Sequence, residues 1–148
     1  MKHLLLTLLL FTLSFPTLAQ TKHEVDPVYI ANLLTNSIST DEMREICRFY
    51  HLTESPASEG YTVFTDPHGN AIRFKETTNS GNTNADPLIE LQTKDSKKTI
   101  EKILRDTGYR KHADAYVHGT IHALSYTRCL LTSSGSHRIL TFLKVHNK

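Results

Sequence analysis

Tyr61-Thr-Val-Phe-Thr-Asp-Pro-His-Gly-Asn-Ala-Ile-Arg-Phe74 is the strongest local structural signal in this chain of 148 residues. Its two ends carry aromatic and β-branched residues that alternate with polar ones, a pattern typical of strands. Between them, Asp66, Pro67 and Gly69 occupy positions of a type I turn at which each residue type is favoured. The stretch therefore predicts a β-hairpin, with His68 as a solvated residue at its tip.

Two helices are predicted before this hairpin. The first begins with Asp26 as N-cap and Pro27 at the first helical position, and it ends near Asn36. The second begins with a capping box formed by Ser39 and Glu42. Apolar residues at helical spacing then give it one apolar face, made of Met43, Ile46, Cys47 and Tyr50. This spacing predicts that Cys47 points into the core.

The remainder predicts a loop, a third helix and further strands. The loop covers 77–86, and the helix is capped by Asp95 or Ser96 and ends just before Gly108. The predicted strands are 88–91, 109–117, 121–131 and 137–145, and the last is apolar on both faces, as expected of a central strand. We predict an α+β fold in the order α-α-β-β-β-α-β-β-β. Its antiparallel sheet has five to six strands, with all three helices packed on one face.

A short pattern of glycines occurs twice in the sequence, and we call it the glycine echo. Gly60-Tyr61 precedes His68-Gly69, and Gly108-Tyr109 precedes His118-Gly119, each pair downstream of a predicted helix. The two spacings differ by two residues, so chance explains the echo better than a duplicated helix-plus-hairpin unit.

The first 19 residues read as a cleavable signal peptide. Lys2 and His3 form a basic start, Leu4 to Phe15 is apolar, and Thr17-Leu18-Ala19 places small residues before the cleavage point. We expect residues 20–148 to form a single α+β domain that is secreted or periplasmic. No other apolar run approaches the length of a membrane span.

The charge content narrows the class of binding partner, and the cysteine content predicts a disulfide. The chain has 17 basic and 15 acidic residues, scattered along the sequence, which argues against nucleic acid as a partner. Cys47 and Cys129 are the only cysteines, and an oxidising compartment favours a disulfide between them. The alternative is a pair of buried free thiols.

The histidines are the residues that we considered as candidates for catalysis or metal binding. We considered acid–base catalysis by His112, His122 and His137, with Lys111 or Arg128 stabilising a phosphate-like transition state. We also considered metal binding by His118 and His122, but Gly119 lacks the carboxylate that a helical metalloprotease motif requires. No cofactor motif is present in the sequence, and ordinary exposed imidazoles are the simpler interpretation.

Tyrosines suggest a binding surface instead. Tyr116 and Tyr126 lie in predicted strands, and if they share an exposed sheet face they provide large contact area at low entropic cost. The leading expectation is an exported, non-catalytic protein that binds another protein, as inhibitors, immunity proteins and envelope assembly factors do. The alternatives are a small secreted histidine-dependent, nuclease-like hydrolase and a cone-shaped α+β domain that binds a small apolar ligand.

Overall fold

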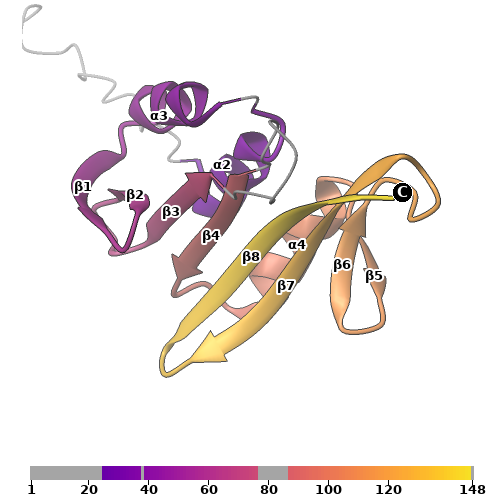
Figure 1. Cartoon of the computed structure of the whole chain (residues 1–148). Helices are drawn as coiled ribbons and strands as arrows, with labels where there is room; N and C mark the ends of the chain where they lie inside the picture. The colour runs from indigo at the N-terminus through magenta and orange to yellow at the C-terminus, as the bar shows by residue number, and fades with distance from the viewer. Residues whose placement is uncertain (1–24, 38, 77–86, 148) are drawn as a thin grey trace, which may run out of the picture.

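The computed structural model describes residues 25–37, 39–76 and 87–147 (Figure 1). These residues contain three helices, α2 (Pro27–Leu34), α3 (Thr40–Phe49) and α4 (Lys97–Asp106). They also contain eight strands: β1 (Thr53–Ser58), β2 (Tyr61–Thr65), β3 (Ala71–Glu76), β4 (Pro87–Thr93), β5 (Arg110–His112), β6 (Ala115–His118), β7 (Ser125–Ser134) and β8 (His137–His146). The predicted signal peptide and the predicted loop at 77–86 lie outside the described residues.

All eight strands form one antiparallel sheet in the order β1-β2-β3-β4-β8-β7-β6-β5. The predicted α+β class and antiparallel sheet are confirmed, and β8 is central, as its two apolar faces indicated. The predicted number of strands and their exact order are wrong. No strand was predicted where β1 lies, and one strand was predicted over 109–117 where the structure has β5 and β6.

Both errors concern the edges of the sheet. β1 is mostly exposed and contains Pro56, and all three residues of β5 are exposed. Edge strands are often short, polar or interrupted by proline, because these features prevent unwanted pairing with another chain. Neither strand therefore has the buried alternation by which a strand is recognised in sequence.

The helix N-caps and the hairpin turn predicted from the sequence are confirmed. The side chains of Asp26, Ser39 and Ser96 accept hydrogen bonds from the first-turn amides of α2, α3 and α4, at 2.8, 3.2 and 3.1 Å. In the β2–β3 turn, the amide of Gly69 donates to the carbonyl of Asp66 at 3.2 Å. The Asp66 carboxylate also accepts from the amides of His68 and Asn70, which closes the turn.

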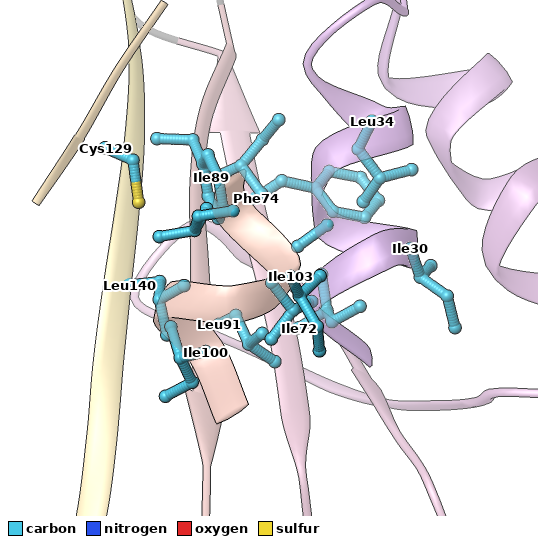
Figure 2. Packing of buried hydrophobic residues seen from close by; sticks show 14 of the residues in the cluster. Ile30, Leu34, Ile72, Phe74, Ile89, Leu91, Ile100, Ile103, Cys129 and Leu140 are labelled. Atoms are coloured by element: carbon cyan, nitrogen blue, oxygen red, sulfur yellow. The ribbon is translucent and has the colours of Figure 1, made fainter. Parts of the chain in front are cut away.

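The core lies between the sheet and the helix layer. Strand pairing aligns two rows of side chains on the helix-facing side, and nearly all of these side chains are buried. One row contains Phe64, Ile72, Leu91, Leu140 and Leu131, and the other contains Phe74, Ile89, Phe142, Cys129 and Tyr116. Ile30 and Leu34 of α2 belong to the same buried cluster, part of which Figure 2 shows.

The structure divides into two similar units, each a helix followed by four strands. α3 precedes β1–β4 and α4 precedes β5–β8, and the units meet where β4 pairs with β8. One sequence offset relates the caps Ser39 and Ser96. The same offset relates the amide-to-carbonyl bonds Leu52–Cys47 and Tyr109–Leu104, at 3.0 and 2.8 Å.

The glycine echo in the sequence gives the wrong alignment of these units. Gly60 lies between β1 and β2, whereas Gly108 follows the C-cap of α4. The position that corresponds to Gly108 is His51, which follows α3 with a φ of 60°, beside 92° for Gly108. A residue other than glycine therefore takes the left-handed conformation in the first unit, and the correspondence is invisible to a search for repeated glycines.

The two cysteines are free buried thiols and do not form the predicted disulfide. Cys47 does point into the core, but α3 contacts β1 and β3, whereas Cys129 lies on β7. β4 and β8 separate β3 from β7, a distance of roughly 14 Å at ordinary strand spacing. A disulfide requires Cα atoms within about 7 Å, so this placement does not allow one.

We predict that the folded protein does not react with a thiol reagent such as Ellman's reagent. Burial raises the pKa of Cys47 to about 12 and that of Cys129 further still, and neither residue is exposed. In denaturant, without reductant, two thiols per chain should react. No reaction in denaturant would show that the cysteines form a disulfide and that α3 is misplaced.

Candidate functional site

The side of the sheet that faces away from the helices is the candidate functional site. In Figure 1, α4 lies behind β7 and β8, and the other side of these strands faces the viewer. From β2 to β7, strand alternation places on this side residues that are half-buried or exposed, whereas Ala115 and Val117 of β6 are buried there. We call this surface the open face and define it by Tyr61, Val63, Arg73, Lys75, Leu88, Glu90, Tyr126, Arg128, Leu130, Ile139, Thr141, Leu143 and Val145.

The centre of the open face is aliphatic. Strand pairing sets Leu143 beside Arg128 and Leu130 beside Thr141, while Leu88 and Ile139 lie on the adjoining strands β4 and β8. All four aliphatic side chains are half-buried although none belongs to the buried core cluster. Each of them therefore keeps apolar surface accessible on the side away from the helices.

One end of the open face carries an aromatic ring held between two cations. The guanidinium carbon of Arg73 lies 4.9 Å from the ring centroid of Tyr61, and the Lys75 ammonium lies 4.3 Å from it. Arg73 also forms an ion pair with Glu90 on β4. These contacts hold Tyr61 and Arg73 in one geometry before any partner arrives, which lowers the entropic cost of binding.

The two tyrosines predicted to bind lie on opposite sides of the sheet. Tyr126 is half-buried on the open face, where it pairs with Val145. Tyr116 pairs with Cys129 on the helix side, is 9% exposed, and donates a hydrogen bond to Glu101 of α4 at 2.5 Å. Burial, followed by this hydrogen bond, raises the pKa of Tyr116 to about 12. Tyr116 therefore joins β6 to α4 and does not share a face with Tyr126.

Sequence reasoning missed Arg73 and Lys75, and it placed Tyr61 in a predicted strand without relating it to these two cations. The alternation in the predicted hairpin contained the signal, because Ile72 and Phe74 are apolar and their neighbours Arg73 and Lys75 must point the other way. What the sequence lacked was the pairing that brings Leu88 and Leu143 beside them.

The structure does not bring the candidate catalytic histidines together. His112 ends β5 next to the turn into β6, whereas His122 lies in the connection at the opposite end of β6. His137 begins β8, three strands and several residues away from His112, on the order of 20 Å at ordinary strand spacing. Lys111 and Arg128, proposed to assist them, lie on opposite sides of the sheet.

The two proposed metal ligands lie on different parts of the chain. His118 lies at the end of β6 with its ring 5.2 Å from that of Tyr109, whereas His122 lies in the connection that follows. Within the part of the chain that the structure describes, no group of three histidine, cysteine or acidic residues is placed to hold a metal ion.

A cone-shaped fold would hold an apolar ligand between the helices and the sheet. The hollow lined by Thr35, Ser37, Ile89 and Phe142 has a volume of about 10 Å³, which is room for about one water molecule. Small-ligand pockets are commonly 300–1,000 Å³.

Comparison of the chain with protein-family models, with curated proteins and with solved structures found no match. Among the described residues, no helix has the length and apolar character to cross a lipid bilayer.

A pair of carboxyl groups lies at the N-terminus of α2. Asp26 caps that helix and lies close to Asp95, which precedes α4. Partial burial, with the neighbouring charge of Asp95 as a smaller cause, raises the pKa of Asp26 from 3.8 to about 6. Ionisation of Asp26 therefore opposes folding.

We predict that the protein loses stability as pH rises from 4 to 6. A raised pKa means that the folded state binds more protons than the unfolded state in this interval, so the free energy of unfolding falls and then levels off. Asp26→Asn keeps the capping oxygen and should stabilise the protein at pH 7 by about 1 kcal/mol, a figure that allows for partial solvent exposure.

Urea unfolding at several pH values measures this effect. Asp41→Asn is the control, because Asp41 also lies in the first turn of a helix but is exposed. A pH dependence equal in wild type and Asp26→Asn would contradict the assignment.

Proposed function

We propose that the mature chain is an exported protein that binds another protein through the open face and catalyses no reaction. The observation that carries this proposal is the composition of that face, in which tyrosine and arginine surround accessible aliphatic side chains. Tyrosine and arginine are enriched among the residues that dominate binding energy at protein interfaces.

The dimensions of the open face suit a protein partner. It extends from β2 to β7, four strand spacings, or roughly 19 Å across, and the ten residues of β7 and of β8 extend it by roughly 33 Å along the strands. A standard interface buries about 800 Å² on each partner, an area of the same order as this surface. A small molecule would leave most of the aliphatic centre in contact with water.

The charge of the open face defines the partner further. Its members include three cations, Arg73, Lys75 and Arg128, and one carboxylate, Glu90. Arg128 is also paired at 3.1 Å with Asp114, which lies beside the face in the β5–β6 turn. We therefore expect a partner surface with an apolar centre and acidic side chains at its rim, because opposite charges steer association.

The place of action follows from the predicted signal peptide. Export before folding would put this surface in the periplasm or outside the cell, where the partner is to be sought. The support is the tripartite pattern of residues 1–19.

We predict that a photo-crosslinking amino acid at Leu143 captures one discrete partner in the exported fraction of the producing cells. Tyr126→Ala should weaken binding of that purified partner about tenfold or more, because truncation removes a large contact from the middle of the interface. Isothermal titration calorimetry measures the affinity, and circular dichroism verifies the fold.

Tyr29→Ala is the matched control. Tyr29 is also partly exposed, at 37%, but it lies on the outer side of α2, so its loss should leave affinity unchanged. Equal loss in both variants would contradict the open face as the binding surface. Hydrolysis of a phosphodiester substrate that disappears in His112→Ala or His122→Ala would instead support the hydrolase.

A further inference from the structure

We propose a second binding site, for a phosphate monoester group, in the hollow between α4 and the β5–β6 hairpin. Glu101 and Arg105 of α4, Tyr109, Arg110 and Lys111 around the start of β5, and Tyr116 of β6 line this hollow. Its volume is about 440 Å³, within the range of pockets that bind small molecules.

The course of the chain brings α4 and the start of β5 together at this hollow. Glu101 and Arg105 are four residues apart, so they lie one above the other on one side of α4. The amide of Tyr109 donates to the carbonyl of Leu104 at 2.8 Å, which turns the chain sharply from the helix into β5. Arg110 and Lys111 follow at once and therefore lie beside the end of the helix that carries Arg105.

The cations of this hollow lack the ion pairs that neutralise other arginines of the protein. Arg44, Arg48, Arg73 and Arg128 each lie within 4 Å of a carboxylate. Among the described residues, neither Arg105, Arg110 nor Lys111 has a carboxylate that close. Cations without ion pairs that line one hollow repel each other, and an anion relieves that repulsion.

Glu101 is the carboxylate of the hollow, and its partners keep it ionised. It accepts the hydrogen bond from Tyr116 and lies 3.8 Å from Lys97, on the preceding turn of α4. The Tyr116 hydrogen bond and, next, the neighbouring cations lower its pKa. Glu101 is thus an internal negative charge that competes with any anion for Lys111 and Arg105.

The charge count selects the class of anion. On the helix side, Arg105 and Lys111 have no ion pair and Lys97 offsets the charge of Glu101, so two positive charges remain, whereas strand alternation places Arg110 on the other side of β5. A phosphate monoester carries −1.5 to −2 near neutral pH and offers three acceptor oxygens, which matches these charges and the donors of one guanidinium and one ammonium group. A carboxylate carries half that charge.

This site is independent of the proposed protein-binding surface. Lys111 and Tyr116 lie on the helix side of the sheet, whereas Tyr126 lies on the open face. Arg110 lies on the same side of the sheet as Arg128, but on the edge strand β5, outside the residues that define the open face. Loss of one activity should therefore leave the other intact, and Tyr126→Ala should bind phosphate normally.

Two probes that share a phosphate monoester test the site. Glycerol 3-phosphate presents the group in solution, and phosphatidylcholine vesicles with and without phosphatidic acid present it on a lipid. The full mature protein is titrated at pH 7.5 and low salt, by NMR chemical shifts for the soluble probe and by sedimentation for the vesicles. Saturable binding to either probe supports the site and shows which source it accepts.

Matched variants of α4 and β5 make the result specific. Arg105→Ala and Lys111→Ala should each weaken binding about tenfold, since each removes a charge-assisted hydrogen bond. Glu101→Gln keeps an acceptor for Tyr116 and removes the competing charge, so binding should tighten several-fold. Lys98→Ala, an exposed lysine of α4 outside the hollow, should bind as wild type does.

The proposal is overturned if neither probe binds saturably, or if Lys98→Ala weakens binding as much as Arg105→Ala. It is also overturned if sodium acetate binds the hollow as tightly as glycerol 3-phosphate. Weaker binding of glycerol 3-phosphate at pH 5.5 than at pH 7.5 supports it, because the monoester loses charge near pH 6.

Discussion

The antiparallel pairing of β4 with β8 is the constraint on which this structure depends. It joins two units of one helix and four strands into a single sheet, with Ile89 opposite Phe142 and Leu91 opposite Leu140. All four side chains are buried at the centre of the core. Without this pairing, each unit would expose a long apolar edge strand, which is a template for aggregation.

The same pairing explains why the two faces of the sheet differ. α2 precedes both units and contacts β4, α3 and α4, so it covers the junction on the helix side. On the other side, the junction brings Leu88 of the first unit beside the strand that carries Leu143 of the second. Both units therefore contribute strands to the open face. The hollow between α4 and the β5–β6 hairpin, which we propose to bind a phosphate monoester, lies in the second unit alone.

How much the sequence predicts depends on the range of the interactions involved. Caps and turns are local, so Asp26, Ser39 and the 61–74 hairpin were predicted correctly. Strand β1 was missed because an exposed edge strand with a proline has no apolar pattern. The disulfide was predicted from the expected oxidising compartment and from the number of cysteines. Neither shows how many strands lie between the two residues in the sheet.

The candidate site was less predictable than the fold, because it depends on register. Tyr116 and Tyr126 are both strand tyrosines. The pairing of Tyr116 with Cys129 places Tyr116 on the helix side of the sheet, where it packs in the core. Similarly, His112 and His122 are near each other in sequence but lie at opposite ends of the β5–β6 hairpin. Sequence shows which residues alternate within one strand, but not which strand lies next to it.

Native-state hydrogen exchange, resolved by residue, tests the central claim most directly. If β4 and β8 form the middle of one sheet, their amides should exchange slowest and should open only with global unfolding. Exchange from β4 and β8 that is faster than from the β2–β3 and β6–β7 pairs, or separate opening of the two units, would contradict a continuous sheet and with it the open face.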